Sequence, residues 1–207
     1  MDALHTIALA AGLSWASGIR LYAVLFIVGL GNALGWVTLP HDLQVLSHPL
    51  VLSAAGAMLV IEFFADKIPG FDSVWDAVHT FVRVPAGALL ALGAVGNENA
   101  PQAVAAAILG GALATGTHLT KAGTRALINT SPEPFSNWAA SFTEEALVLA
   151  VLWAAISHPY LFFALLAIFV ALTLWLTPRI LRGMQSVLRR IGEIVGGKAG
   201  GTHAPAK

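Results

Sequence analysis

The sequence predicts an all-α polytopic membrane protein with about six to seven transmembrane helices, some of them short or broken. Hydrophobic residues make up 57% of the 207 residues and charged residues only 11%, against roughly 25% in ordinary globular proteins. The mean hydropathy is +0.77, and several apolar runs approach the ~20 residues that a helix needs to cross a bilayer. Too little polar material remains to cover a soluble domain, which excludes a soluble enzyme, a nucleic-acid-binding protein and a disordered chain.

The apolar runs define the expected spans. The cleanest covers residues 160–176, which contain no charge. Residues 21–34 and 51–64 are similarly apolar, and the second of these runs contains a single acid, Glu62. The run at 101–117 is rich in alanine and glycine, which predicts a closely packed helix at the centre of a bundle, because small side chains let helix backbones approach each other.

Two further apolar runs are too short to span a membrane alone. Residues 84–95 and 146–156 would each cover only ~16–18 Å at the rise of an α-helix. Either each helix extends towards its N-terminus through charged residues, or each is half of a broken or re-entrant element. Both alternatives place ionisable groups at membrane depth, where interrupted segments often mark transporter sites. Residues 4–34 form either one long broken helix or two short ones, which leaves the number of spans open.

The chain resembles itself at a spacing of about half its length. The small-residue stretch that begins at Ala10 runs into a basic residue, Arg20, and resembles the stretch that begins at Gly110. The His-Pro pair at His48 resembles the pair at His158, and an apolar run follows each. The sequence therefore predicts two repeats, for which the inverted orientation of many secondary transporters is favoured.

The predicted domain organisation combines this repeat with a change of composition near the C-terminus. Residues 1–178 form the transmembrane domain, with one repeat at about 4–98 and the other at about 101–178. Residues 179–195 combine an apolar stripe at helical spacing with a basic flank, which predicts an amphipathic helix on the membrane surface. The glycine-rich residues 196–207 predict a disordered tail.

The distribution of charge predicts the orientation of the chain. Eleven basic and eleven acidic residues give a formal net charge of zero. However, six of the bases and only one of the acids lie in residues 179–207, so the transmembrane domain carries an excess of acid. Lys and Arg beside a span mark its cytoplasmic side, which predicts a cytoplasmic C-terminus. Three basic residues are expected to contact anionic lipid head groups: Arg182, Arg189 and Arg190.

The scarce charges inside the apolar runs supply the candidate functional residues. An ionisable group within a span is costly unless it is paired, neutralised or hydrated, so it indicates a functional site by default. The side chains expected to line an ion or substrate pathway are Arg20, Glu62, Asp66, Asp72, Asp76, His79, Arg83, Lys121, Arg125, Glu144 and Glu145. For Arg20 the alternative is that it ends a short helix and reaches lipid phosphate by snorkelling.

A polar stripe follows the first proline break. Its members are Asp72, Asp76, His79 and Arg83, at spacings of 4, 3 and 4 residues. One interpretation is an interfacial helix with a solvated polar face and internal ion pairs. The other is that the acids, together with Glu62, form an acidic vestibule or an oxygen-rich site for a hard cation. Helical spacing does not show that ligands converge, so the pattern leaves metal binding open.

The second half brings basic and acidic residues together. Lys121 and Arg125 share a helix face, and two adjacent carboxylates, Glu144 and Glu145, follow another proline break. Adjacent residues point about 100° apart on a helix, so the two carboxylates are not expected to face one partner. We expect one of them to pair with Arg83 or with one of the two basic residues, across the interface between the repeats.

Three segments resemble those of a known family. The first segment has the motif G-L-S-x-x-x-G-x-R, present as Gly12-Leu13-Ser14 with Gly18 and Arg20. The second is an acidic stretch broken by a proline, with Glu62, Asp66, Pro69, Asp72 and Asp76. The third has the motif T-K-A, present as Thr120-Lys121-Ala122, with a downstream Glu at 144 or 145. Over residues 8–177 the chain resembles domain-of-unknown-function family 4126, a family of small bacterial integral membrane proteins. The resemblance implies a multi-pass protein of the bacterial cytoplasmic (inner) membrane, and it implies no reaction.

Three functions remain open at this point. A channel or secondary transporter for a small ion or solute is favoured, with a cation or proton preferred because the membrane part is acidic. A membrane scaffold or assembly protein, whose polar groups only lock helices together, is the alternative. A lipid-modifying enzyme would use His79 with a carboxylate, but the sequence has no Gly-x-Ser-x-Gly or His-Glu-x-x-His motif, so we lean against an enzyme.

The expected partners follow from the same composition. Membrane lipids are the main partner, a homo-oligomer is left open, and nucleic acid is not expected. No cofactor is expected, and the chain has no cysteine, so thiolate chemistry and cysteine metal sites do not arise.

Overall fold

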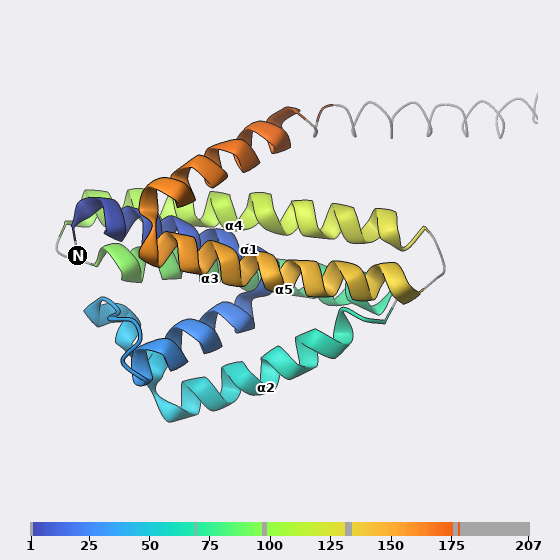
Figure 1. Ribbon diagram of the computed structural model, residues 1–207, viewed down its shortest axis with the longest axis horizontal. Helices are drawn as coiled ribbons and strands as arrows, with labels where there is room; N and C mark the ends of the chain where they lie inside the picture. Colours follow the sequence, from blue (N-terminus) through green and yellow to red (C-terminus); the bar gives the residue numbers. More distant parts are fainter. Residues whose placement is uncertain (1, 69, 97–98, 131–133, 176–177, 179–207) are drawn as a thin grey trace, which may run out of the picture. The chain divides into compact units, whose positions relative to one another are not determined.

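The computed structural model describes residues 2–68, 70–96, 99–130, 134–175 and 178. Within these residues the chain is helical apart from short turns and connections (Figure 1). The elements are α1 (Ala3–Ala33), the 3₁₀ helix η1 (His41–Ser47), α2 (Pro49–Ala65), α3 (Phe71–Val95), α4 (Ala100–Ile128) and α5 (Pro134–Ser157), followed by an apolar helix at Pro159–Trp175. The chain divides into two compact units, Met1–Phe163 and Ala164–Lys207. The first unit holds α1 to α5.

Four of the described helices, α1, α3, α4 and α5, are long and apolar enough to cross a membrane. The pair η1 and α2, bent by 66° at the break between them, adds a fifth candidate span, and the helix Pro159–Trp175 is apolar but shorter. This confirms the predicted all-α polytopic membrane protein. The two short apolar runs are completed by extension, because α3 and α5 begin well before them and include their charged residues. The predicted repeats stay a prediction.

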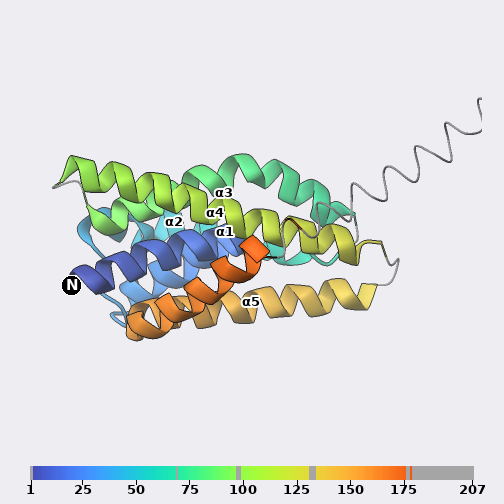
Figure 2. The same cartoon turned by 90° about the horizontal axis from the view of Figure 1, so that it is seen from above.

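The central helix of the first unit is α1, which packs against α2, α3, α4 and α5. Figure 1 and Figure 2 show α1 running among α3, α4 and α5 in both views. Its apolar window is 72% buried, against 28% for that of α4. The prediction that the segment 101–117 occupies the centre was therefore wrong. The small residues of α4 line only one face, and its branched side chains, such as Ile108 and Leu109, are exposed.

The small-residue face of α4 lies close to α1 and α3. A Cβ added at Gly18 of α1 would overlap the side chain of Thr117 and the carbonyl of Ala114, and one added at Gly87 of α3 would overlap Ala114 as well. Backbones at this separation are typical of helix pairs that associate through small residues in membranes. The close approach matters for the site because it brings the C-terminal half of α4 against the middle of α1.

The polar face of α3 is turned inward. All four members of its stripe are buried: Asp72, Asp76, His79 and Arg83. The opposite face is apolar and exposed, with Val74 61%, Val78 60% and Phe81 84% accessible. A soluble amphipathic helix buries its apolar face, so the reversed arrangement fits a helix whose apolar face meets lipid. The interpretation of this helix as interfacial, with a solvated polar face, was therefore wrong.

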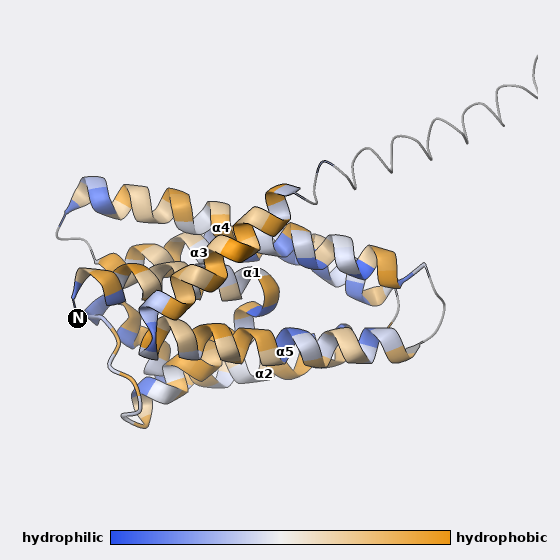
Figure 3. Ribbon diagram, turned by 45° about the horizontal axis from the view of Figure 1, so that its top comes forward, coloured by the Kyte–Doolittle hydropathy of each residue, from blue (hydrophilic) through white to orange (hydrophobic). Residues whose placement is uncertain are grey.

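The polar residues gather in one region of the bundle. Figure 3 shows hydrophilic colour in the C-terminal half of α4 and the N-terminal half of α5, whereas the remainder of these helices is mostly hydrophobic. The predicted amphipathic helix 179–195, with Arg182, Arg189 and Arg190, and the predicted tail 196–207 lie outside the described residues.

Candidate functional site

In the described part of the first unit, eleven charged side chains form one cluster between the helices. The acids are Glu62, Asp66, Asp72, Asp76, Glu144 and Glu145, and the bases are Arg20, Lys67, Arg83, Lys121 and Arg125. All except the adjacent carboxylates of α5 are at most 5% exposed. This charge cluster contains every residue of the sequence-predicted pathway except His79, and it adds Lys67.

Arg20 lies where α1 is broken. Its backbone angles (φ −142°, ψ 80°) are not helical, although the helix continues on both sides. The Nζ of Lys121 donates a hydrogen bond of 3.2 Å to the carbonyl of Ile19, beside the break. Broken helices persist at membrane depth only where side chains, water or other protein groups satisfy the freed backbone groups. The amine of Lys121 performs this role for one carbonyl.

The guanidinium of Arg20 is wholly buried and contacts three acids. Its Nη2 lies 3.1 Å from Asp66 Oδ2 and 3.5 Å from Glu145 Oε1, and its Nε lies 3.6 Å from Glu144 Oε2. Nη2 also donates a 2.6 Å hydrogen bond to the hydroxyl of Ser141. The alternative in which Arg20 snorkels to lipid phosphate was therefore wrong, because its side chain turns into the bundle.

These contacts also correct the expectation that the two carboxylates cannot face one partner. Glu144 and Glu145 both reach Arg20 because a guanidinium presents donors from three nitrogens spread over a plane. Different nitrogens of Arg20 therefore meet the two neighbouring side chains, although these leave α5 in different directions. Both lie well inside α5, which begins at Pro134.

Arg83 holds two acids of the first half of the chain. Its Nη2 donates to Glu62 Oε1 at 2.5 Å, and its Nη1 donates to Asp76 Oδ1 at 2.7 Å. Nη1 also lies 3.1 Å from Nδ1 of His118. Of the three bases offered as partners for Glu144 or Glu145, Arg83 is therefore not the one that pairs with them: Asp76 lies two turns earlier on the same helix, and Glu62 comes from the preceding helix.

The structure confirms that one of the three bases pairs with a carboxylate of α5, but both residues belong to the second predicted repeat, so the pair does not join the two repeats. Arg125 binds Glu144 through two parallel hydrogen bonds, Nε to Oε1 and Nη2 to Oε2, each 2.9 Å. This bidentate geometry is the strongest form of an arginine–carboxylate pair. The Nζ of Lys121 lies 3.5 Å from Glu144 Oε2.

Asp66 joins the two halves of the cluster. It follows α2, and its Oδ2 lies 2.9 Å from the Nζ of Lys121, 3.1 Å from Arg20 and 3.8 Å from Arg125. Lys121 also lies 3.3 Å from Asp76 Oδ1. A continuous path of opposite charges therefore crosses the bundle from Glu62 on α2 to Glu144 on α5.

Asp72 is connected to the cluster through the side-chain amides of Asn129 and Asn137. Both of its carboxylate oxygens accept from the Nδ2 of Asn129, at 2.8 and 3.0 Å. Asn129 accepts in turn from Asn137, whose Oδ1 accepts from Arg125 at 3.1 Å.

His79 lies apart from the ion pairs: its ring nitrogens face the carbonyl of Trp75 at 2.8 Å and the hydroxyl of Tyr22 at 3.2 Å.

The cluster does not form a recognisable metal site. Among the residues that the structure describes, no group of three or more His, Asp and Glu side chains could hold a metal ion. Each of Glu62, Asp66, Asp76 and Glu144 faces at least one base instead. The geometry therefore favours an ion-pair network over an oxygen-rich cage for a hard cation.

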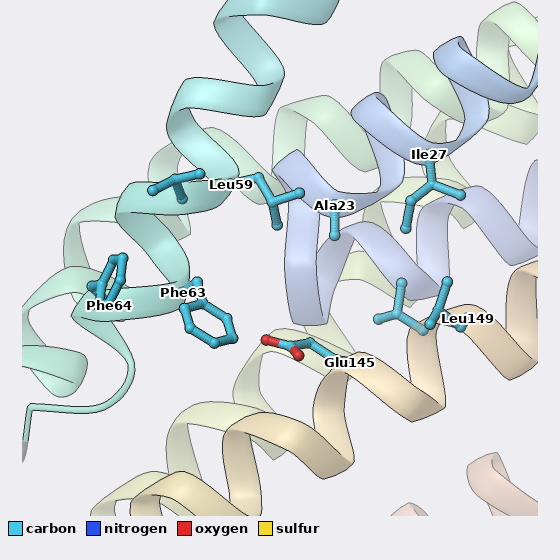
Figure 4. Close-up of a pocket in the computed structure, with 9 residues that line it drawn as sticks. Ala23, Ile27, Leu59, Phe63, Phe64, Glu145 and Leu149 are labelled. Atoms are coloured by element: carbon cyan, nitrogen blue, oxygen red, sulfur yellow. The ribbon is translucent and has the colours of Figure 1, made fainter.

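A pocket of about 420 Å³ borders the cluster where α1, α2 and α5 meet. Glu145 is the one charged side chain among its nine lining residues, which are Ala23, Ile27, Leu59, Val60, Phe63, Phe64, Glu145, Val148 and Leu149. Figure 4 shows the carboxylate of Glu145 projecting from α5 towards the ring of Phe63 on α2, with aliphatic side chains of α1 and α5 beside it. The pocket therefore joins an apolar space to the edge of the charge cluster.

The family model described as "Domain of unknown function (DUF4126)" matches residues 7–179 of the chain. The chain belongs to the DUF4126 family. No curated protein and no solved structure matches it. All three segments that carry the resemblance contribute to the charge cluster of this DUF4126 protein: the first supplies Arg20, the second four of its six acids, and the third Lys121 with the downstream pair Glu144 and Glu145. The family motifs therefore correspond to one place in the fold.

The sequence interpretation of this DUF4126 chain missed several polar members of the site. Lys67 donates hydrogen bonds of 3.2 Å to the carbonyl of Phe63 and to Ser141, and its Nζ lies 2.9 Å from the centre of the Phe63 ring, a cation–π contact. Asn137 and Ser141 precede Glu144 by seven and three residues. These spacings place all three on one face of a helix, a signal that was available in the sequence.

Proposed function

We propose that this multi-pass membrane protein is a channel or secondary transporter for a small solute or ion, with a proton or another cation exchanging at Glu145. The balance of charge in the cluster supports the proposal. Among the residues that the structure describes, its six acids exceed its five bases by one, so this part of the cluster carries one negative charge when fully ionised. A negative charge among apolar helices is costly unless a cation or a proton neutralises it.

Glu145 is the carboxylate best placed to carry this excess. Its ion pair with Arg20 measures 3.5 Å, and Oε1 has no hydrogen-bond partner among the described residues. The side chain is 27% exposed, which is more than that of Glu144 at 13%. Asp72 also lacks a basic partner in the described part of the chain, but it is fully buried and accepts hydrogen bonds from Asn129.

The position of Glu145 suggests how its occupancy is coupled to the helix bundle. Arg20 contacts Asp66, Glu144 and Glu145, and it is also the residue at which α1 is broken. A proton or cation at Glu145 removes one of the three negative charges that hold this guanidinium. The remaining contacts then favour a different position of Arg20, and the broken helix gives the backbone freedom to follow, as in transporters built on interrupted helices.

Flux through purified protein in liposomes tests this proposal. Proteoliposomes loaded with a pH-sensitive dye should show proton movement when a gradient of H⁺, Na⁺ or K⁺ is imposed. Replacing Glu145 with glutamine should lower that rate at least tenfold, because the excess charge is gone, while the melting temperature in detergent stays near that of the wild type.

Glu145→Asp is the matched variant, because it retains the carboxylate and should keep a measurable part of the flux. Protein-free liposomes and liposomes that contain the Glu145→Gln variant give the background. Equal flux in wild type and Glu145→Gln, or no flux of these ions or of common metabolites, would contradict the proposal.

The completeness of the other ion pairs favours a second candidate, a membrane scaffold whose cluster only fixes the helices. In that case neutral substitutions of Glu145 would affect neither flux nor growth in a complementation assay.

The third candidate, an acid–base enzyme, gains no support from the position of His79, because its ring nitrogens face Tyr22 and a backbone carbonyl.

The orientation proposed for the chain places its C-terminus on the cytoplasmic side of a bacterial inner membrane. The support is the excess of basic residues in the sequence 179–207 and the tendency of Lys and Arg to stay on that side. A C-terminal fusion to alkaline phosphatase should be inactive and a fusion to a fluorescent protein should be bright. The opposite pattern would overturn the orientation.

A further inference from the structure

We infer that the pocket beside Glu145 binds an amphipathic amine: an ammonium group at the carboxylate, with an aliphatic or aromatic body among the surrounding side chains. This inference deepens the proposed transport by naming a class of substrate. It rests on the proposed function only for movement across the membrane, because binding is measurable without transport.

The size and lining of the pocket fit the body of such a ligand. Its volume of about 420 Å³ lies within the ~300–1,000 Å³ of typical small-molecule pockets. Its walls come from Ile27, Leu59 and Leu149, together with the rings of Phe63 and Phe64. Sites of this kind take an apolar body and fix its orientation through a few polar groups. Here a single carboxylate supplies the polar contact.

The charge at the pocket selects a cation. An anionic ligand would place its own charge beside Glu145, and a neutral ligand would leave the cluster with its excess negative charge. An ammonium group at Glu145 balances the six acids against five bases plus one ligand cation. The two bases near Glu145 are shared with other groups: Arg20 also pairs with Asp66 and Glu144, at 3.1 and 3.6 Å, which are its other two acids. Lys67 interacts with Glu145 electrostatically, but its Nζ lies over the ring of Phe63 and donates to Ser141.

The outer wall of the pocket indicates that the ligand arrives from the lipid. Val60, Phe64 and Leu149 line the pocket and are 56%, 61% and 52% exposed. Exposed apolar side chains on spanning helices face hydrocarbon, which is where an amphipathic amine concentrates. A small hydrophilic cation would have no advantage on this route.

Binding to the full-length protein in a non-ionic detergent tests the inference. The probe is 4-phenylbutylamine, compared with the neutral analogue 4-phenylbutan-1-ol and the anion 5-phenylpentanoate, by equilibrium dialysis at pH 7. The amine should bind at least tenfold more tightly than the alcohol, and the anion should be the weakest. Glu145→Gln should weaken amine binding at least tenfold and leave binding of the alcohol unchanged.

A second pair of variants tests the location without changing any charge. Val60→Trp fills the pocket from its exposed wall and should weaken both the amine and the alcohol. Val104→Trp is the matched control, because Val104 lies on α4, is 59% exposed and does not line the pocket. It should bind the amine as the wild type does. Equal loss of binding in both tryptophan variants would overturn the location.

The outcomes separate this inference from the proposed function. Equal affinity for amine and alcohol shows an unselective lipid-filled groove and overturns the inference, as does a preference for the anion. Proton flux that depends on Glu145, without amine binding, also overturns the inference and leaves transport standing. Selective amine binding, without flux of the amine or of any ion into liposomes, supports the pocket and refutes transport.

Discussion

Replacing Arg83 with methionine should destabilise the protein more than almost any other single substitution in the described residues. Arg83 is wholly buried and holds Glu62 at 2.5 Å and Asp76 at 2.7 Å. Without the guanidinium, Glu62 loses its one ion-pair partner among the described residues. Removing one partner of a buried ion pair costs about 3–5 kcal/mol, because the other charge stays buried without compensation.

The loss is measurable as a lower apparent melting temperature of the purified protein in detergent. For a chain of this length, each kcal/mol corresponds to roughly 2–4 °C. The double variant Arg83→Met with Glu62→Gln is the control, because it removes the orphaned carboxylate along with the base. It should be more stable than Arg83→Met alone, which a double-mutant cycle resolves. A single variant that melts with the wild type would show that the pair carries no stability.

Asp66→Asn is expected to have the second large effect. One oxygen of Asp66 faces three bases, with Lys121 at 2.9 Å, Arg20 at 3.1 Å and Arg125 at 3.8 Å. Neutralising it leaves three buried cations facing one another with one acid fewer between them. The cost should again be about 3–5 kcal/mol, and it should appear together with loss of any flux, because Arg20 loses its nearest carboxylate.

Asp2→Asn is the matched control for Asp66→Asn. Asp2 caps the start of α1 by accepting a hydrogen bond from the backbone N–H of His5, which holds the pKa of its carboxyl below the usual value. Asparagine caps helices about as well as aspartate, so this exposed substitution should leave the melting temperature unchanged. If Asp66→Asn melts at the same temperature as Asp2→Asn, the view of Asp66 as the central acid is wrong.

Most of the fold and most of the membership of the charge cluster could be predicted from the sequence. Charged residues are so scarce in this chain that each one inside an apolar run is a candidate member of the site. The spacing of Asp72, Asp76 and Arg83 places them on one face of α3, and the same rule places Lys121 and Arg125 on one face of α4. The structure brings these faces together, as expected for groups that must be paired within lipid.

The choice of partners could not be predicted, because it depends on how the helices pack. Arg83, Lys121 and Arg125 were equal candidates for the partner on α5, and the bundle places Arg83 against Glu62 of α2 and Arg125 against Glu144. The central position of α1 was missed for a related reason: small residues show that a helix can approach its neighbours, and they do not show how many neighbours it has. The sequence left open one long broken helix over residues 4–34, but no proline marks the position of the break, which the structure shows at Arg20.

The buried Arg20 also constrains the order in which the protein can be made. α1 leaves the ribosome before α2 to α5, and it carries a guanidinium that is costly to leave alone in hydrocarbon. Ser141, which accepts its shortest hydrogen bond, follows 121 residues later, and Asp66 and Glu144 also come after it. We therefore expect the nascent α1 to stay at the interface or beside the insertion machinery until its partners have been synthesised. Chains truncated before α5 lack Ser141 and Glu144, so we expect them to insert less stably than the full chain.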